Sequence, residues 1–279
     1  MNTTNHNKQN KIAVINDISG FGRCSVAVAL PIISQLRIQC CPVPTSIFST
    51  HTGFEDYFFD DYTDRMQPYI DKWKAIGLRF DGILTGFLGS ATQIEIVDRF
   101  IRDFADDNTT IIIDPVMGDN GKPYPTYTTD MCRRMKELVH HADILTPNLT
   151  EACILTDTPY TPDRFKQADY FCIADKLIDI GADKVVITGI RNGSMVTNII
   201  CEKGKEPHLL RQKRVGHERS GTGDVFSAII AADSVHNIDF TSSVRKASAF
   251  VRDCIAVTEA FDIPPTDGVC FEEILHTLK

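Results

Sequence analysis

Residues 217–233 read HERSGTGDVFSAIIAAD and place a glycine loop and an aspartate directly before an apolar run with helical character. Glycines let an anion approach the backbone, and a helix N-terminus offers unpaired N–H groups with a partial positive charge. The loop Gly221–Gly223 can therefore bind a phosphate or an oxyanion, with Asp224 beside it. The alternative is that Asp224 only caps a helix over Val225–Ala232, because Asp is a favoured N-cap residue.

A second set of polar residues follows two other strand-like segments. Asp114 ends the apolar run of IIIDPVMGDNGKPYP (111–125), and Asn148 and Glu151 stand in TPNLTEACIL (146–155). If both strand ends face one crevice, Asp114 and Glu151 become oxygen ligands, directly or through water, for a partly hydrated magnesium ion. Two structural alternatives stay open: an Asp-Pro turn at Asp114, and a capping box in which Asn148 and Glu151 begin a helix.

Nucleotide motifs of other classes are missing. Gly20 and Gly22 follow a strand, but Ser25 stands where a dinucleotide fingerprint has its third glycine, and no ribose-binding acid ends the next strand. The P-loop pattern G-x-x-x-x-G-K-[ST] does not occur in the chain.

The elements that must position these residues alternate between apolar strands and amphipathic helices, which predicts an α/β fold with a mostly parallel sheet covered by helices on both faces. Ligands bind such sheets beyond the carboxyl ends of the strands. The segments that we expect to be strands are 11–17, 40–48, 80–87, 109–116, 143–148 and 184–190. The polar and aromatic residues at or near the ends of these strands, in chain order, are Asp17, Thr45, Phe87, Asp114, Asn148 and Thr188.

Composition narrows the class of protein. The formal charge of −8 argues against a nucleic-acid partner, and no apolar run reaches the length of about 18 residues that a membrane span needs. Nine cysteines without a C-x-x-C spacing suggest reduced thiols in a cytoplasmic protein, with Cys153, Cys172 and Cys254 in the core. We expect a disordered polar leader over residues 1–10 and a single domain over 11–279.

These motifs occur together and in a defined order. With GTGD, DPVMGD, TPN followed by Glu151, PTSIFSTHTGF and LTGFLGS, the chain resembles the pyridoxal kinases of the ribokinase superfamily over about residues 11 to 260. The resemblance implies a ribokinase-like three-layer sandwich. It also implies transfer of the γ-phosphoryl group of ATP to the 5′-hydroxyl of a B6 vitamer, with Mg²⁺, a monovalent cation such as K⁺, and a homodimer.

Site residues follow from the same resemblance. Asp224 matches the general base, which accepts the hydroxyl proton while the loop holds the migrating phosphoryl group. The anion hole is matched by Gly221, Thr222 and Gly223, the metal and triphosphate side by Asp114 and Glu151, the nucleotide contacts by Asn148, Thr188, Arg219 and Ser220, and the pyridine pocket by Asp17, Thr45, Ser46 and Phe87.

Three positions depart from the family pattern. Asp17 stands where a serine is common, Phe87 where a tyrosine is common, and Thr188 where some members have a lysine. A carboxylate at position 17 that met the 4′ substituent would favour the amine of pyridoxamine over pyridoxal. Two other functions stay open: a hydroxymethylpyrimidine (phosphate) kinase of the same fold, which often has cysteine where Asp224 stands, and a non-catalytic sensor of B6 or nucleotide.

Overall fold

The structure, a computed structural model, describes residues 6–279. Its residues group into two compact units, Met1–Thr110 with Val215–Lys279 and Ile111–Arg214. We describe each unit separately. The single domain expected over 11–279 stays a prediction, and half of the expected leader, residues 1–5, lies outside the described residues.

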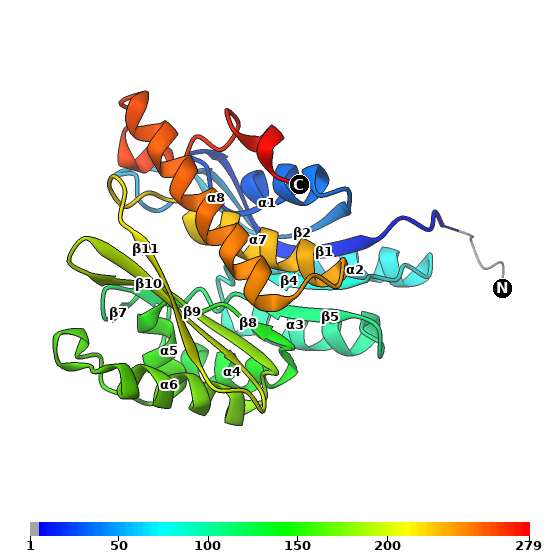
Figure 1. The fold of residues 1–279 in the computed structure, drawn as a ribbon. Helices are drawn as coiled ribbons and strands as arrows, with labels where there is room; N and C mark the ends of the chain where they lie inside the picture. Colours follow the sequence, from blue (N-terminus) through cyan, green and yellow to red (C-terminus); the bar gives the residue numbers. More distant parts are fainter. Residues whose placement is uncertain (1–5) are drawn as a thin grey trace. The chain divides into compact units, whose positions relative to one another are not determined.

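The first unit is built on four strands in the order β4-β1-β2-β3. Figure 1 labels β4, β1 and β2. β1 pairs in parallel with both β2 and β4, and β3 is antiparallel to β2. The first seven residues of β1 are buried, as a central strand covered on both faces requires. The elements of this unit are β1 (Lys11–Phe21), α1 (Ser25–Gln35), β2 (Gln39–Thr50), β3 (Phe59–Asp61), α2 (Thr63–Ala75), β4 (Gly82–Thr85), α3 (Ala91–Phe104), α7 (Thr222–Val235), α8 (Phe240–Ala260), η3 (Pro265–Asp267) and η4 (Leu275–Thr277).

The helices of this unit form two groups. α7 packs against α1, α8 and β4, while α2 packs against α3 and β2. α7 is apolar on almost every side from Val225 to Ala232, which is typical of a helix enclosed in the core. Its N-terminus therefore has a fixed position in this unit.

Five strands of the second unit pair in the order β11-β10-β9-β8-β5, and two further short strands, β6 and β7, pair with each other. β5, β8 and β9 are parallel, and β10 runs antiparallel to both of its neighbours. α6 packs on β9 and β10, and α5 packs between α4 and α6. The elements are β5 (Thr110–Ile113), β6 (Gly118–Asp119), β7 (Lys122–Pro123), α4 (Thr129–Leu138), η1 (Val139–His141), β8 (Ile144–Leu145), α5 (Leu149–Leu155), η2 (Pro162–Arg164), α6 (Gln167–Ile180), β9 (Lys184–Asn192), β10 (Met195–Glu202) and β11 (His208–Lys213).

The predicted fold class is confirmed, but three site residues lie elsewhere in their elements than expected. Asp17 is inside β1, because the strand continues to Phe21 through further pairing with β2. Thr188 is likewise inside β9 and not beyond its end. α7 begins at Thr222 with Gly221 as its N-cap, so Asp224 stands in the first turn and is not the capping residue.

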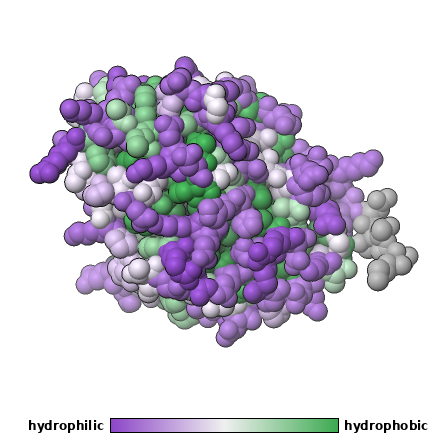
Figure 2. Space-filling view, turned by 90° about the horizontal axis from the view of Figure 1, so that it is seen from below, coloured by the Kyte–Doolittle hydropathy of each residue, from purple (hydrophilic) through white to green (hydrophobic). Residues whose placement is uncertain are grey.

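Most of the face drawn in Figure 2 is hydrophilic, with smaller apolar areas between the polar side chains.

The predicted positions of three cysteines can be compared with the structure. Cys153 and Cys254 are buried as expected, whereas Cys172 is exposed on α6, so its predicted core position is wrong.

Across residues 6–279, no helix combines the length and the apolar character that crossing a membrane requires.

Candidate active site

Asp224 is half-buried and receives hydrogen bonds from two other elements of the first unit. The amide Nδ2 of Asn16, on β1, donates to Asp224 Oδ1 at 3.2 Å. The backbone N–H of Ser25, at the start of α1, also donates to this carboxylate. Ser25 has a φ of 55°, a strained conformation for a non-glycine residue that is common at functional sites. The carboxylate is thus oriented by groups from β1, α1 and α7.

The pKa of Asp224 is raised to about 6, chiefly because burial penalises the charged form. The Asp17 carboxylate raises this pKa further, while the hydrogen bonds from Ser25 and Asn16 lower it. A carboxylate with a pKa near the working pH is suited to general base catalysis, because it is ionised at neutral pH and still basic enough to accept a proton.

Asn16 was not predicted from the sequence. Its Oδ1 accepts the backbone N–H groups of Phe87, at 2.9 Å, and of Asp17, at 2.9 Å. A Cβ on Gly86 would lie 2.3 Å from Asn16 Nδ2, so only glycine leaves room for this amide. One side chain therefore connects the loop after β4 to Asp224. The available signal was a polar residue directly after the apolar run IAVI in a segment expected to be a buried strand, since buried polar groups require partners.

Replacing Asn16 by alanine should move the pH dependence of catalysis. Asn16→Ala removes a donor that favours the ionised carboxylate, so the pKa of Asp224 should rise above about 6. A hydrogen bond to a charged group is worth roughly 1.5–3 kcal/mol, so the shift should be about one pH unit or more. We expect the acidic limb of kcat/KM to move to higher pH by this amount. Asn108→Ala, on an exposed loop, is the matched control, and an unmoved limb in Asn16→Ala would contradict the role.

In the glycine loop, the backbone conformation at position 221 requires glycine, whereas position 223 is open to solvent. Gly221 has a φ of 79°, and a Cβ there would lie 2.0 Å from the carbonyl oxygen of Arg23. Gly223, in contrast, is exposed and has no positive φ, and a Cβ at this position would meet no atom within 4 Å. The first-turn N–H groups of a helix have no intrahelical acceptors, so this open surface can take an anion.

Asp17 is only 5% exposed and already has two hydroxyl partners. Ser25 Oγ donates to its Oδ1 at 2.5 Å and Ser19 Oγ to its Oδ2 at 2.9 Å. Burial raises the pKa of Asp17, and the two serines partly offset this. The Asp17 carboxylate therefore holds the strained start of α1 through Ser25. It also places a carboxylate close to that of Asp224. Direct contact of Asp17 with a vitamer stays a prediction, which this geometry does not favour.

The residues predicted for a ring pocket lie close together. The hydroxyl of Thr45, which is fully buried, donates to the carbonyl oxygen of Phe87 at 3.0 Å, so Thr45 fixes the backbone of the Phe87 loop. Ser46 is also fully buried, and its hydroxyl has no partner among the described residues. The Phe87 ring lies 6.0 Å from that of Phe48, which lies 4.8 Å from Phe59. Phe48 and Phe59 therefore continue the aromatic contacts of Phe87, and neither residue was predicted from the sequence.

In the second unit, Asn148 and Glu151 form the capping box of α5. Glu151 Oε2 accepts the N–H of Asn148 at 2.8 Å, and Oε1 accepts that of Met117 at 3.1 Å. Asn148 Nδ2 donates to the carbonyl of Gly118 at 2.8 Å. Burial, with the nearby charge of Asp114, holds the pKa of Glu151 well above its usual range. The structure thus brings Asp114, Asn148 and Glu151 together, and the capping alternative describes Glu151 as it stands.

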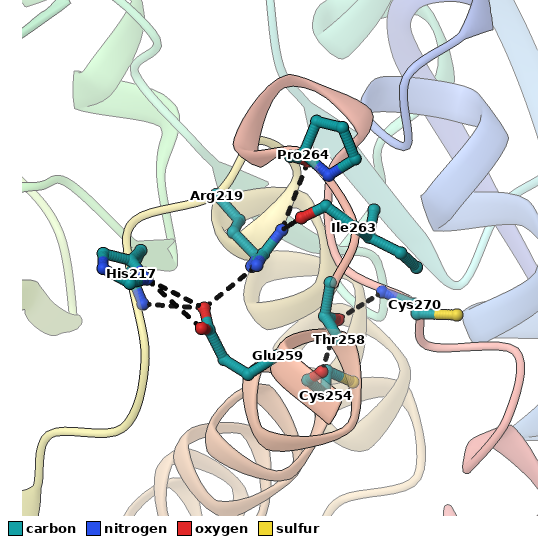
Figure 3. Close-up of polar contacts among 8 residues, drawn as sticks. All are labelled: His217, Arg219, Cys254, Thr258, Glu259, Ile263, Pro264 and Cys270. Atoms are coloured by element: carbon teal, nitrogen blue, oxygen red, sulfur yellow. Dashed lines mark hydrogen bonds and ion pairs between the residues drawn. The ribbon is translucent and has the colours of Figure 1, made fainter. Parts of the chain in front are cut away.

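The remaining predicted nucleotide residues are in different surroundings. Thr188 is half-buried, and its N–H donates to the carbonyl of Pro147 at 2.9 Å, beside Asn148. Ser220 is half-buried next to the glycine loop. Arg219 is buried and binds Glu259 and two carbonyl groups (Figure 3), so its guanidinium has partners within the first unit. Nucleotide contact by these residues stays a prediction.

Comparison with known proteins agrees with this arrangement. The family model for phosphomethylpyrimidine kinase matches residues 34–268. The pyridoxine/pyridoxal/pyridoxamine kinase of Bordetella avium is 30% identical over 64% of this chain, and the match spans 61% of that enzyme. The pyridoxal kinase of Leifsonia xyli is 25% identical over 89% of each chain.

A crystal structure of a Bacteroides thetaiotaomicron protein, assigned to the phosphomethylpyrimidine kinases, superposes with a TM-score of 0.95. Its sequence is 34% identical, with 99% of this chain and 96% of that chain covered. A second crystal form of that protein contains pyridoxal. The expected ribokinase-like fold and the resemblance to B6 kinases are confirmed. The chain therefore belongs to the phosphomethylpyrimidine kinase family.

Proposed function

We propose that this protein is an ATP-dependent kinase that phosphorylates the 5′-hydroxymethyl group of a B6 vitamer. Asp224 acts as the general base that accepts the hydroxyl proton, and Asn16 and the Ser25 N–H hold its carboxylate in place. The N–H groups at the start of α7 stabilise the charge of the migrating phosphoryl group. Thr45 would hold the Phe87 loop of the ring pocket, and Phe87 with Phe48 would form one wall.

The observation that carries this proposal is the carboxylate of Asp224 in the first turn of α7, directly beside the open backbone of Gly223. A base and an anion site are thereby adjacent on one rigid helix. This arrangement supplies the positioning and charge neutralisation that phosphoryl transfer needs.

Magnesium would be held on the side of Asp114 and Glu151. The described residues contain no group of three or more His, Cys, Asp or Glu side chains that could enclose a metal. Mg²⁺ keeps several waters and is bound through one or two carboxylates plus substrate phosphates. Bound there, the ion neutralises phosphate charge. Asp114 would contact its hydration shell, while Glu151, whose oxygens both accept backbone N–H groups, would hold the loop.

Substitutions of Asp114 and Glu151 should have different effects in a magnesium titration. Asp114→Asn should raise the Mg²⁺ concentration for half-maximal activity about ten-fold, because a negative charge beside the hydrated ion is lost. Glu151→Gln should mainly lower the melting temperature, since loss of a cap costs about 1 kcal/mol. Asp157→Asn, an exposed carboxylate of the same unit, serves as the control. An unchanged titration in Asp114→Asn would remove it from the magnesium site.

A hydroxymethylpyrimidine (phosphate) kinase is the second candidate, and the family model that matches residues 34–268 favours it. Release of ADP should be measured with pyridoxal, pyridoxine, pyridoxamine and 4-amino-5-hydroxymethyl-2-methylpyrimidine. We expect kcat/KM to be highest for a B6 vitamer, because Asp224 is an aspartate where the pyrimidine kinases often have cysteine. Turnover of the aminopyrimidine alone would select the second candidate, and no turnover of any of the four would reject both. The homodimer and the cytoplasmic location stay predictions.

A further inference from the structure

A buried glutamine connects two segments of the proposed ring pocket. Gln93, in the first turn of α3, is 0% exposed. Its Oε1 accepts the backbone N–H of Gly89 at 2.7 Å, and its Nε2 donates to the carbonyl oxygen of Thr45 at 2.8 Å. Gly89 lies in the loop after β4, and Thr45 lies in β2. One amide group therefore binds the backbone of both segments.

The same amide also reaches the junction of β3 and α2. Its Nε2 donates to Thr63 Oγ1 at 2.9 Å and to Asp61 Oδ1 at 3.1 Å. These neighbours determine the orientation of the amide, because carbonyl and carboxylate oxygens only accept hydrogen bonds and the N–H of Gly89 only donates. Leaving a buried polar group unpaired costs free energy, so the side chain of Gln93 is held in this one arrangement.

The loop after β4 carries Phe87 and is bound by three buried side chains. Asn16 Oδ1 accepts the N–H of Phe87 at 2.9 Å, and Thr45 Oγ1 donates to the carbonyl oxygen of Phe87 at 3.0 Å. Gln93 adds the bond at Gly89, two residues further along the loop. Loss of the Gln93 amide would therefore leave the Gly89 end of the loop less constrained.

The two segments that Gln93 connects carry residues predicted for the pyridine ring. The Thr45 carbonyl that Gln93 binds belongs to the peptide group joining Thr45 to Ser46. A Cβ added to Gly89 would lie 3.6 Å from Ser46 Oγ and 3.6 Å from the Phe87 ring, so these residues adjoin. Gln93 bridges the two backbones at this place and thereby sets the spacing between Ser46 and Phe87.

We propose that Gln93 is a positioning residue for the vitamer ring, which holds Thr45 and Ser46 of β2 and the Phe87 loop at the spacing that the ring requires. It acts on binding, because the apparent affinity falls with the fraction of molecules in which the two segments are correctly spaced. The inference rests on the proposed kinase function and assigns a role that the sequence did not indicate.

Gln93→Met removes the amide and keeps a side chain of similar length. We expect the Kd for pyridoxal, measured by calorimetry without nucleotide, to rise about ten-fold, because the correctly spaced conformation becomes a minor one. The KM for the vitamer should rise in proportion. Because Asp224 and the glycine loop are unchanged, kcat at saturating vitamer should stay within about two-fold of wild type, and the Kd for ADP should not change.

Two control variants separate positioning from general loss of stability. Gln67→Met removes an amide on α2 that donates to Asp71 of the same helix, and it should leave the Kd for pyridoxal unchanged. Ile101→Val, at a buried position of α3, should lower the melting temperature because it removes a buried methyl group. It should also leave the Kd for pyridoxal unchanged.

A second substitution tests the same contacts from the surface. Asp61 is exposed in β3 and accepts a bond from Gln93, so Asp61→Ala should fold and raise the Kd for pyridoxal about three-fold, as the loss of one hydrogen bond to the amide implies. Asp60→Ala is the matched control, because Asp60 is paired with Arg65.

An unchanged Kd for pyridoxal in folded Gln93→Met would overturn the inference. An equal rise in the Kd for ADP, or the same rise in Ile101→Val, would overturn it too, because either shows general loosening of the protein. If Gln93→Met does not fold, the comparison of Asp61→Ala with Asp60→Ala decides. A wild-type protein that neither binds nor phosphorylates any B6 vitamer would reject the proposed function and this inference with it, whereas vitamer binding that Gln93→Met retains would reject the inference alone.

Discussion

Asp224→Asn is expected to lower kcat by about 10²-fold or more, with little change in the affinity for ATP. The amide has nearly the same shape as the carboxylate but cannot accept the proton of the substrate hydroxyl. The base acts mainly in the transition state, so the loss appears in kcat and not in nucleotide binding. Coupled ADP release gives kcat, and titration with nucleotide in the absence of vitamer gives the affinity.

The pH dependence of kcat/KM tests the role of Asp224 independently. Because the pKa of Asp224 is about 6, the ionised fraction and therefore kcat/KM should fall about ten-fold per unit below that pH. Asp224→Asn should lack this limb. Asp253→Asn, an exposed carboxylate on α8, should keep both rate and limb. Near-wild-type turnover in folded Asp224→Asn would end the assignment of the base.

Asp224→Asn should lower the rate but raise the stability of the protein. The folded pKa of Asp224 is raised, so its protonated form stabilises the fold at low pH, and this contribution is lost as pH rises from about 4 to about 6. An amide carries no charge to bury. Asp224→Asn should therefore increase the free energy of unfolding at pH 7 by about 1–3 kcal/mol. A group that lowers stability and raises the rate is typical of an active site, whereas loss of a simple cap would lower stability.

The sequence predicted the fold class and the order of the elements, because apolar periodicity is a local property of the chain. Asp114 directly follows β5, Asn148 follows β8 and Phe87 follows β4, all as expected. The end of β1 was misplaced because Ser19, Gly20 and Phe21 resemble a turn. In the structure, pairing of Ser19 with Phe48 and of Phe21 with Thr50 extends the strand.

The polar network around the site was less predictable, because its partners are distant in sequence. Asn16 and Asp224 are 208 residues apart, and Arg219 lies 44 residues from Ile263. Neither pairing leaves a local motif. The positive φ of Ser25 could not be predicted from the sequence either, since serine is not a residue that signals this conformation. Such residues are set by tertiary packing, and the sequence only marks them as polar residues in unusual places.

Gly223→Ala is the second change with a large expected effect, and it separates stability from function most clearly. A Cβ at Gly223 meets no atom within 4 Å, and the residue is in the first turn of α7 with no positive φ. Alanine is the better helix former, so the free energy of unfolding should stay the same or rise by up to about 1 kcal/mol. The methyl group would, however, occupy the open surface over the first-turn N–H groups.

If that surface holds the migrating phosphoryl group, Gly223→Ala should lower kcat by about 10²-fold, comparable to the loss of one oxyanion-hole donor. Melting temperature and kcat are measured on the same preparation. Gly77→Ala is the control, because it also meets no atom within 4 Å but lies far along the chain at the end of α2. Its φ of 70° should cost stability and leave kcat unchanged, the reverse of the pattern for Gly223→Ala. A Gly223→Ala protein that is stable and fully active would mean that the anion binds elsewhere than on this turn.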